Sequence, residues 1–296
     1  MLNNKWMIIS LLIGNILLCS LVSSIPLYSD AILQRMLIKQ LEQQQIDTNK
    51  YPGTIEIKFT SLNVNRGYEI KSLNNFENKI SEIEQTLGLP LAEKVTTYAL
   101  NSLRVEPVLE RSSSVNDKVL QLRFSSDLKN HIEITSGRMY SDELQDGAIE
   151  VIVNERTLVE QDVLIGEVLQ FASLTYPNGD PILIKVVGVY KNSADNDIYW
   201  VYSPSIYTDV AMMSEPLYRR LFVEGYAEEY SFPSQWYLMF DYTQMNAKNV
   251  ENISDTSAKS KEFFDLYGTS ACRINYMNTL NGFSSAASRL NITLWV

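Results

Sequence analysis

Few residue patterns in the chain could carry out covalent chemistry. The sequence has no G-x-x-x-x-G-K-[ST] phosphate-binding loop and no G-x-S-x-G nucleophile turn. His131 is the only histidine, so a Ser-His-Asp triad could form only around that residue. It stands at the start of an expected strand, which favours a structural or surface role. We therefore predict that the chain is not an enzyme and has no catalytic residue or bound cofactor.

Oxygen-bearing side chains are crowded together at Asn192, Asp195, Asn196 and Asp197, as they are in a calcium-binding loop. The EF-hand pattern lacks its glycine and its closing glutamate at the required spacing. Asn and Asp also favour solvated turns, because their side chains bond to nearby backbone groups. The mismatch favours the solvated turn, and we predict no metal site.

Aromatic residues are concentrated in the segment 191–233. A partly exposed Tyr or Trp can anchor a partner, because it offers a large contact area with a polar tip. The candidates for partner binding are Tyr199, Trp200, Tyr202, Tyr207, Tyr226 and Tyr230. A small subdomain also needs large side chains to fill its own core, so both uses stay open.

Charge and cysteine content narrow the class of protein. The formal net charge is −10 and no stripe of Lys and Arg is present, which excludes a nucleic-acid partner. Of the two cysteines, Cys19 lies in an apolar segment and Cys272 in the remainder, so no disulfide can close within the soluble part.

The N-terminal segment from Trp6 to Ile25 carries no charge. A helix of this length rises about 30 Å, which matches the hydrocarbon thickness of a bilayer. We predict an uncleaved transmembrane helix over Trp6–Leu27 in the plasma membrane, carrying an outer, extracytoplasmic domain. The alternative is a cleaved signal peptide, although Ser20–Val22 and Ser23–Ile25 fit a cleavage site poorly. Basic residues on both sides leave the orientation undetermined by charge.

Two further segments could extend this membrane arrangement. Ile32, Leu33, Met36, Leu37 and Leu41 recur at helical spacing, which predicts a stalk helix continuing the anchor or a short amphipathic surface helix. The chain ends in the apolar run 290–296, which contains a Trp. This run is typical of the start of a truncated second span, and equally of a C-terminal strand.

Between these segments the pattern predicts an α+β fold in which strands and helices alternate irregularly. Strands are expected at 54–60, 118–124, 131–135, 149–153, 163–171, 182–190 and 235–242, and helices at 75–87, 155–161, 216–223 and 249–267. The predicted divisions are the anchor at 1–27, the stalk at 28–48, the outer core at 49–190, an inserted aromatic subdomain at 191–233, the rest of the core at 234–285, and the truncated span at 286–296.

Four ordered segments carry a resemblance to a known family. They are ITSGRMY at 134–140, EVIVNE at 150–155, LIGEVL at 164–169 and IKVVGVY at 184–190. In this order, after an N-terminal span, they resemble the outer domain of FtsX-like ABC transporter permeases, the MacB-like periplasmic core. Gly137 and Gly166 suit turns that need positive φ, and Asn154 suits a helix N-cap, so these are scaffold residues.

The resemblance implies a permease subunit, or its N-terminal part, in an export or mechanotransmission system. Its implied partners are a cytoplasmic ABC ATPase, which alone would bind ATP, and another permease chain or a second copy. Its implied substrate is a lipid, lipoprotein or peptide. The alternative is a stand-alone anchored domain that binds an extracellular ligand or protein. A third class, an anchored hydrolase, is disfavoured by the single histidine.

Overall fold

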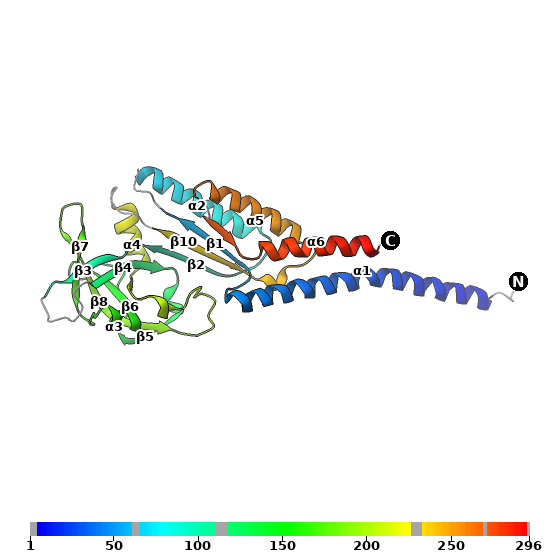
Figure 1. The fold of residues 1–296 in the computed structure, drawn as a ribbon, viewed down its shortest axis with the longest axis horizontal. Coiled ribbons are helices and arrows are strands. Elements are labelled where there is room, and N and C mark those ends of the chain that lie inside the picture. Colours follow the sequence, from blue (N-terminus) through cyan, green and yellow to red (C-terminus); the bar gives the residue numbers. More distant parts are fainter. Residues whose placement is uncertain (1–4, 61–65, 110–117, 226–232, 269–270, 295–296) are drawn as a thin grey trace.

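A computed structural model describes residues 5–60, 66–109, 118–225, 233–268 and 271–294. The fold is mixed α/β, built on one large sheet (Figure 1). Its helices are α1 (Lys5–Thr48), α2 (Arg66–Thr86), α3 (Glu155–Glu160), α4 (Glu215–Tyr218), α5 (Val250–Asp265) and α6 (Met277–Leu294). Short turns of other helix types are η1 (Leu128–Asn130), η2 (Pro204–Ile206), η3 (Arg219–Glu224) and η4 (Tyr242–Gln244).

The sheet has eleven strands. They are β1 (Thr54–Phe59), β2 (Leu91–Ala99), β3 (Leu103–Pro107), β4 (Lys118–Ser125), β5 (Ile132–Gly137), β6 (Ala148–Asn154), β7 (Val168–Thr175), β8 (Pro181–Asn192), β9 (Val210–Met212), β10 (Ser234–Phe240) and β11 (Cys272–Ile274). Their order is β11-β1-β10-β2-β4-β3-β7-β8-β6-β9, with β5 added to β8. An extra parallel pairing of β9 with β4 closes the second half of this path into a ring.

The first half of the sheet, β11-β1-β10-β2, is antiparallel and carries α2 and α5 on one face (Figure 1). Alternate residues of a strand point to opposite faces, so each strand divides its side chains between that covered face and the other. On the covered face Phe76 of α2 packs against Trp236 of β10 and Phe264 of α5, with ring centroids 6.1 and 4.9 Å apart. All three side chains are buried, and they form the centre of the main core.

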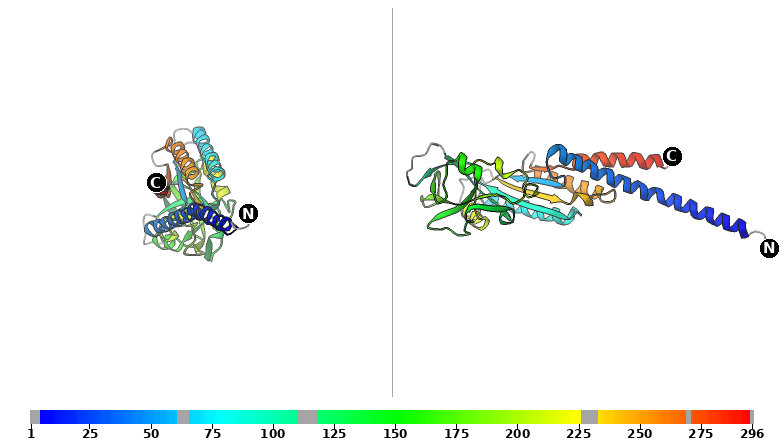
Figure 2. Two further views of the ribbon diagram at one scale, coloured as in Figure 1. Left: turned by 90° about the vertical axis from the view of Figure 1, so that its right-hand side faces the viewer. Right: turned by 90° about the horizontal axis from the view of Figure 1, so that it is seen from below.

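The long helix α1 is continuous across the predicted anchor and stalk and projects far beyond the domain (Figures 1 and 2). Its last turns bury Leu33, Leu37 and Leu41 against the domain, whereas Ile32 of the predicted stripe is exposed and Met36 is half-buried. Gln44 there donates to the Asn275 carbonyl at 2.6 Å and accepts from Thr279 Oγ1 at 2.8 Å, which ties α1 to the start of α6.

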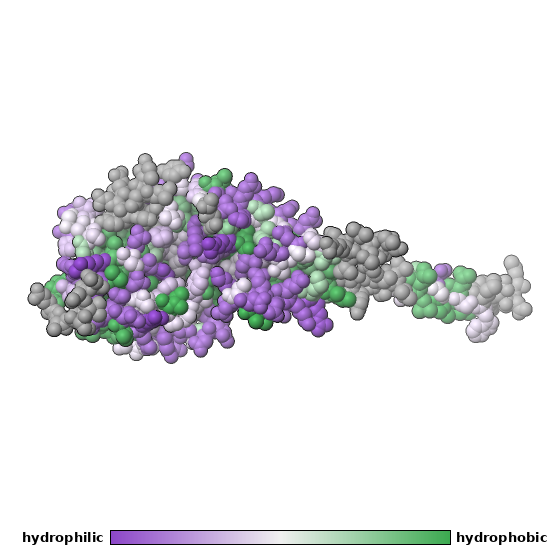
Figure 3. Space-filling view, in the orientation of Figure 1, coloured by the Kyte–Doolittle hydropathy of each residue, from purple (hydrophilic) through white to green (hydrophobic). Residues whose placement is uncertain are grey.

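The N-terminal part of α1, which projects from the domain, is exposed and apolar. Its large side chains from residue 9 to 18 have between 48% and 65% of their surface exposed, and Figure 3 shows the hydrophobic colour there against a largely hydrophilic body. Among the helix residues that the structure describes, no stretch is both long and apolar enough to cross a membrane. The predicted span over Trp6–Leu27 therefore lacks support from the structure, and its side chains from residue 21 onward lie outside the described residues.

Most predicted elements between residues 54 and 267 are present, with shifted ends. Asn154 caps α3 as predicted, since its Oδ1 accepts from the Thr157 N–H at 2.7 Å. The hairpin around the turn at 176–180 is also confirmed. The expectation of a C-terminal strand is wrong, because the chain from Met277 to Leu294 is the helix α6. The nine-residue strand β2 and the shorter strands β3, β9 and β11 were not predicted.

Candidate functional site: an aromatic strap across the open sheet face

The face of the first half-sheet opposite α2 and α5 carries polar and aromatic side chains in rows. Glu56 of β1 stands between Arg273 of β11 and Tyr237 of β10, and Tyr237 is in turn opposite Val95 of β2. Neighbouring side chains in such a row lie close enough to interact directly. We call this face the open face. Residues 193–209 connect β8 to β9 and cross part of it, and we call this segment the strap. The site is built from these two components.

Tyr199 attaches the strap to the sheet by hydrogen bonds and ring stacking. Its hydroxyl lies 2.5 Å from Ser125 Oγ and donates to the Ser126 carbonyl at 2.7 Å. Its ring stacks on the His131 imidazole at 3.8 Å between centroids, with an angle of 6° between the planes. Burial raises the pKa of Tyr199 far above its ordinary value, so the hydroxyl stays protonated and available as a donor.

His131 and Asp197 hold the start of the strap. Nδ1 of His131 lies 2.7 Å from Asp197 Oδ2, while Asp197 Oδ1 accepts from the Tyr199 N–H at 3.0 Å. The indole N–H of Trp200 donates to the His131 carbonyl at 3.2 Å. These bonds use the only histidine to position the strap, and the geometry assigns it a structural task.

Two of the four oxygen-bearing side chains in the predicted calcium-like turn, Asn192 and Asp195, bond to each other or to the local backbone. Asn192 Nδ2 donates to the Ala194 carbonyl at 3.1 Å and to Asp195 Oδ1 at 3.3 Å. Across the part of the chain that the structure describes, no group of three or more His, Cys, Asp or Glu side chains could hold a metal ion.

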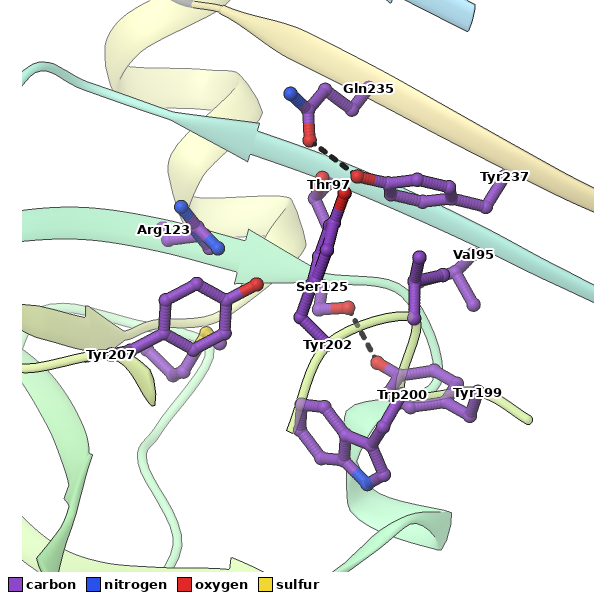
Figure 4. Close-up of a pocket in the computed structure, with 12 residues that line it drawn as sticks. Val95, Thr97, Arg123, Ser125, Tyr199, Trp200, Tyr202, Tyr207, Gln235 and Tyr237 are labelled. Carbon is purple, nitrogen blue, oxygen red and sulfur yellow. Dashed lines mark hydrogen bonds between the residues drawn. The ribbon is translucent and has the colours of Figure 1, made fainter. Parts of the chain in front are cut away.

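Beneath the strap lies an inner pocket of about 30 Å³, which is room for one or two waters. Figure 4 shows side chains converging on it from the strap, β4 and β10. The Arg123 guanidinium lies 4.7 Å from the centre of the Tyr207 ring, within cation–π range. Tyr237 donates to Gln235 Oε1 at 2.8 Å, and burial raises the pKa of Tyr237 well above its usual range. This pocket is too small for a substrate.

The predicted partner-binding residues fall into four groups. Tyr199 has only 2% of its surface exposed and is a core residue, whereas Trp200 and Tyr207 are half-buried. Tyr202 is 39% exposed, the most exposed of the four candidates that the structure describes. Tyr226 and Tyr230 lie outside the described residues. Partner binding by this set stays a prediction.

The predicted subdomain at 191–233 contributes to the main fold in its described part. Its strand β9 pairs with β4 and β6, and its Tyr218 and Phe222 are buried in the same core as Phe76. Arg123, Gln235 and Tyr237 were missed as site residues. The alternation in QWYLMFDY could have separated Tyr237 from its core neighbour Trp236, because adjacent strand residues face opposite ways.

Comparisons with known proteins add little to this geometry. No family model matches the chain, and no curated protein matches it closely enough to count as a relative. Among solved structures, one similar fold is a crystallised domain from Porphyromonas gingivalis that is described only provisionally as part of a permease. The two share 11% identity with a TM-score of 0.33, over 62% of this chain and 68% of that one. At this score the likeness carries no argument about function.

Proposed function

We propose that this chain is a permease subunit, or the N-terminal part of one, in an ABC-type export or mechanotransmission system. In this role its outer domain passes motion driven by a partner ATPase to an extracytoplasmic substrate or partner. The observation that carries the proposal is the build of α1, which is one unbroken helix of 44 residues. Such a helix is about 66 Å long and displaces one end when the other end moves.

The two ends of α1 suit different surroundings. A helix that is apolar on all sides needs an apolar environment all round, and a bilayer supplies one. The N-terminal part of α1 has this character, because Leu11, Leu12, Leu17 and Leu18 are all more than half exposed. The opposite end is held in the domain core by Leu37 and its neighbours. In the proposed role the exposed apolar end of α1 lies against lipid, while the end with Leu33, Leu37 and Leu41 stays packed on the domain.

The position of α6 supports the same role. It leaves the domain beside α1, and both chain ends point the same way (Figure 2). With Gln44 bonded to Asn275 and Thr279, the two helices meet at one junction at the base of the domain. If α1 and α6 tilt relative to one another in a membrane, the movement is transmitted to the domain at this junction.

The partners that this proposal requires are a cytoplasmic ABC ATPase and another permease chain or a second copy of this one. The substrate class is a lipid, a lipoprotein or a peptide. The domain lies outside the plasma membrane, and ATP is bound by the ATPase alone. No residue of the chain is assigned a catalytic role.

The test is co-purification of the chain from native membranes. We expect an ATP-hydrolysing protein to come down with it, and its ATPase activity to fall when residues 6–45 are deleted. A sharper variant is Gln34→Pro, which removes a backbone hydrogen bond of α1 at an exposed position beside the buried Leu33, where the helix reaches the domain. It should keep the ATPase bound but uncouple hydrolysis from transport, whereas Gln34→Ala should leave both intact.

A second candidate function is a stand-alone anchored domain that binds a protein or ligand. The exposed ring of Tyr202 at the edge of the strap favours it. The same purification separates the two, because an intact chain recovered without any ATPase would contradict the transport proposal and leave the binding domain.

A further inference from the structure

A larger cleft of about 730 Å³ lies outside the inner pocket and shares Trp200, Tyr202 and Tyr237 with it. One side is the strap, and the other is formed by the end of α1, by β1 and by β11. Lys50 Nζ reaches across to the Tyr202 hydroxyl at 3.4 Å, so the two sides meet at one corner. Sites for small molecules commonly measure about 300–1,000 Å³, and this cleft falls within that range.

Opposite charges line the two sides of the cleft. The strap side carries the carboxylates of Asp195 and Asp197, of which Asp195 is exposed. The other side carries Lys50 and, on β11, the exposed guanidinium of Arg273. Glu56 on the floor lies 2.9 Å from Lys58 and so has its own cation. Glu56 is also the cross-strand neighbour of Arg273, but among the described residues no carboxylate forms an ion pair with the Arg273 guanidinium, so its outward N–H groups can bind an incoming anion.

Aromatic and apolar side chains lie between these charges. Trp200 and Tyr202 come from the strap, while Tyr237, Met239 and Ile274 come from the sheet. A planar aromatic or aliphatic group placed there would bury area against rings on one side and the sheet on the other. The cleft thus offers an acidic side, an apolar middle and a basic side.

We propose that this cleft binds a short peptide by both of its charged ends. The peptide's ammonium group lies toward Asp195, its carboxylate lies on the Arg273 guanidinium, and an apolar side chain fills the middle. A guanidinium suits a carboxylate because two parallel N–H···O bonds can form. An anion or a cation alone would face a like charge on one side, which disfavours it. The inference does not depend on the proposed coupling to an ATPase.

The experiment is calorimetric titration of the full chain in detergent with the tripeptide Ala-Phe-Ala. Three forms are compared: free at both ends, acetylated at the amino end, and amidated at the carboxyl end. We expect the free form to bind, and each capped form to bind about tenfold more weakly, the loss expected for one charged hydrogen-bonded contact.

Two variants test which residue binds which end of the peptide. Arg273→Gln should weaken the free peptide about tenfold and abolish the preference over the amidated form, and Asp195→Asn should do the same for the acetylated form. Arg104→Gln, at another exposed arginine on β3, is the matched control and should change nothing. Unchanged melting temperatures confirm that the variants are folded. Equal affinity for the free and capped peptides, or no binding of the free peptide at millimolar concentration, would overturn the proposal.

Discussion

The two faces of the half-sheet β11-β1-β10-β2 are made by the same strands yet differ in almost every property. Ile55, Ile57 and Trp236 point to the face under α2 and α5, where they are 0–2% exposed in an apolar core. Glu56 and Tyr237, their immediate neighbours in sequence, point to the other face and are also largely buried, but among polar groups and the strap.

The comparison separates stability from recognition. Apolar burial is the dominant favourable contribution to folding, and it is concentrated under the helices. Buried polar side chains contribute little net free energy but have defined directions, which is what recognition of a ligand requires. The covered face should therefore determine whether the domain folds, and the open face what it binds.

The largest expected effect is on the covered face. Phe76→Ala removes a fully buried ring that contacts Phe59, Trp236 and Phe264, and should lower the free energy of unfolding by about 3–5 kcal/mol. Denaturant titration followed by far-ultraviolet circular dichroism measures it. The milder Phe76→Leu should cost less, and a loss no larger than that of an exposed strap residue would break the distinction between the faces.

An intermediate effect on the free energy of unfolding is expected at Tyr199, which attaches the strap to the sheet. Tyr199→Phe removes the hydroxyl that bonds to Ser125 and Ser126 and leaves the buried Ser125 hydroxyl and the half-buried Ser126 carbonyl without this partner, which should cost about 1–3 kcal/mol. The same denaturant titration applies. Tyr202→Phe, which removes the hydroxyl of the exposed neighbour, serves as the control and should be almost neutral.

Raising the pH above 9 should lower the free energy of unfolding through Cys272, which lies on the covered face. Burial raises the pKa of the Cys272 thiol from 9.0 to about 12, so the unfolded chain loses this proton at lower pH than the folded one. Its stabilising contribution is complete below pH 9 and declines as pH rises toward 12, by about 1 kcal/mol between pH 9 and pH 10. Cys272→Ala should show a shallower decline in unfolding free energy over this interval. An identical decline would show that the thiol titrates equally in both states.

The smallest effect on stability is expected at the rim of the open face. Arg273→Gln and Tyr202→Ala change exposed side chains and should alter the free energy of unfolding by no more than about 0.5 kcal/mol. If Arg273→Gln destabilised the domain as much as Tyr199→Phe, the guanidinium would have a structural task and the open face would not be specialised for binding.

Local patterns were sufficient for elements whose signals are carried within a few residues. The alternation in TIEIKFT predicts β1, and the cap at Asn154 predicts the start of α3, because each depends on contacts between near neighbours. The stripe of Leu33, Leu37 and Leu41 predicts the buried face of α1 for the same reason. Strands such as β9 and β11 have three residues each, which is too short for an alternation of apolar and polar residues to be recognised.

The sequence by itself determined the acidic surface, the absence of a nucleotide loop, the unbroken helical pattern of the stalk and the concentration of tyrosines after residue 198. Only the tertiary structure decided which tyrosines are core and which are exposed, and that Arg273, Glu56 and Tyr237 stand in one row. Glu56 and Arg273 lie 217 positions apart in the sequence. Their proximity arises from sheet pairing between distant segments, and no local spacing encodes that pairing.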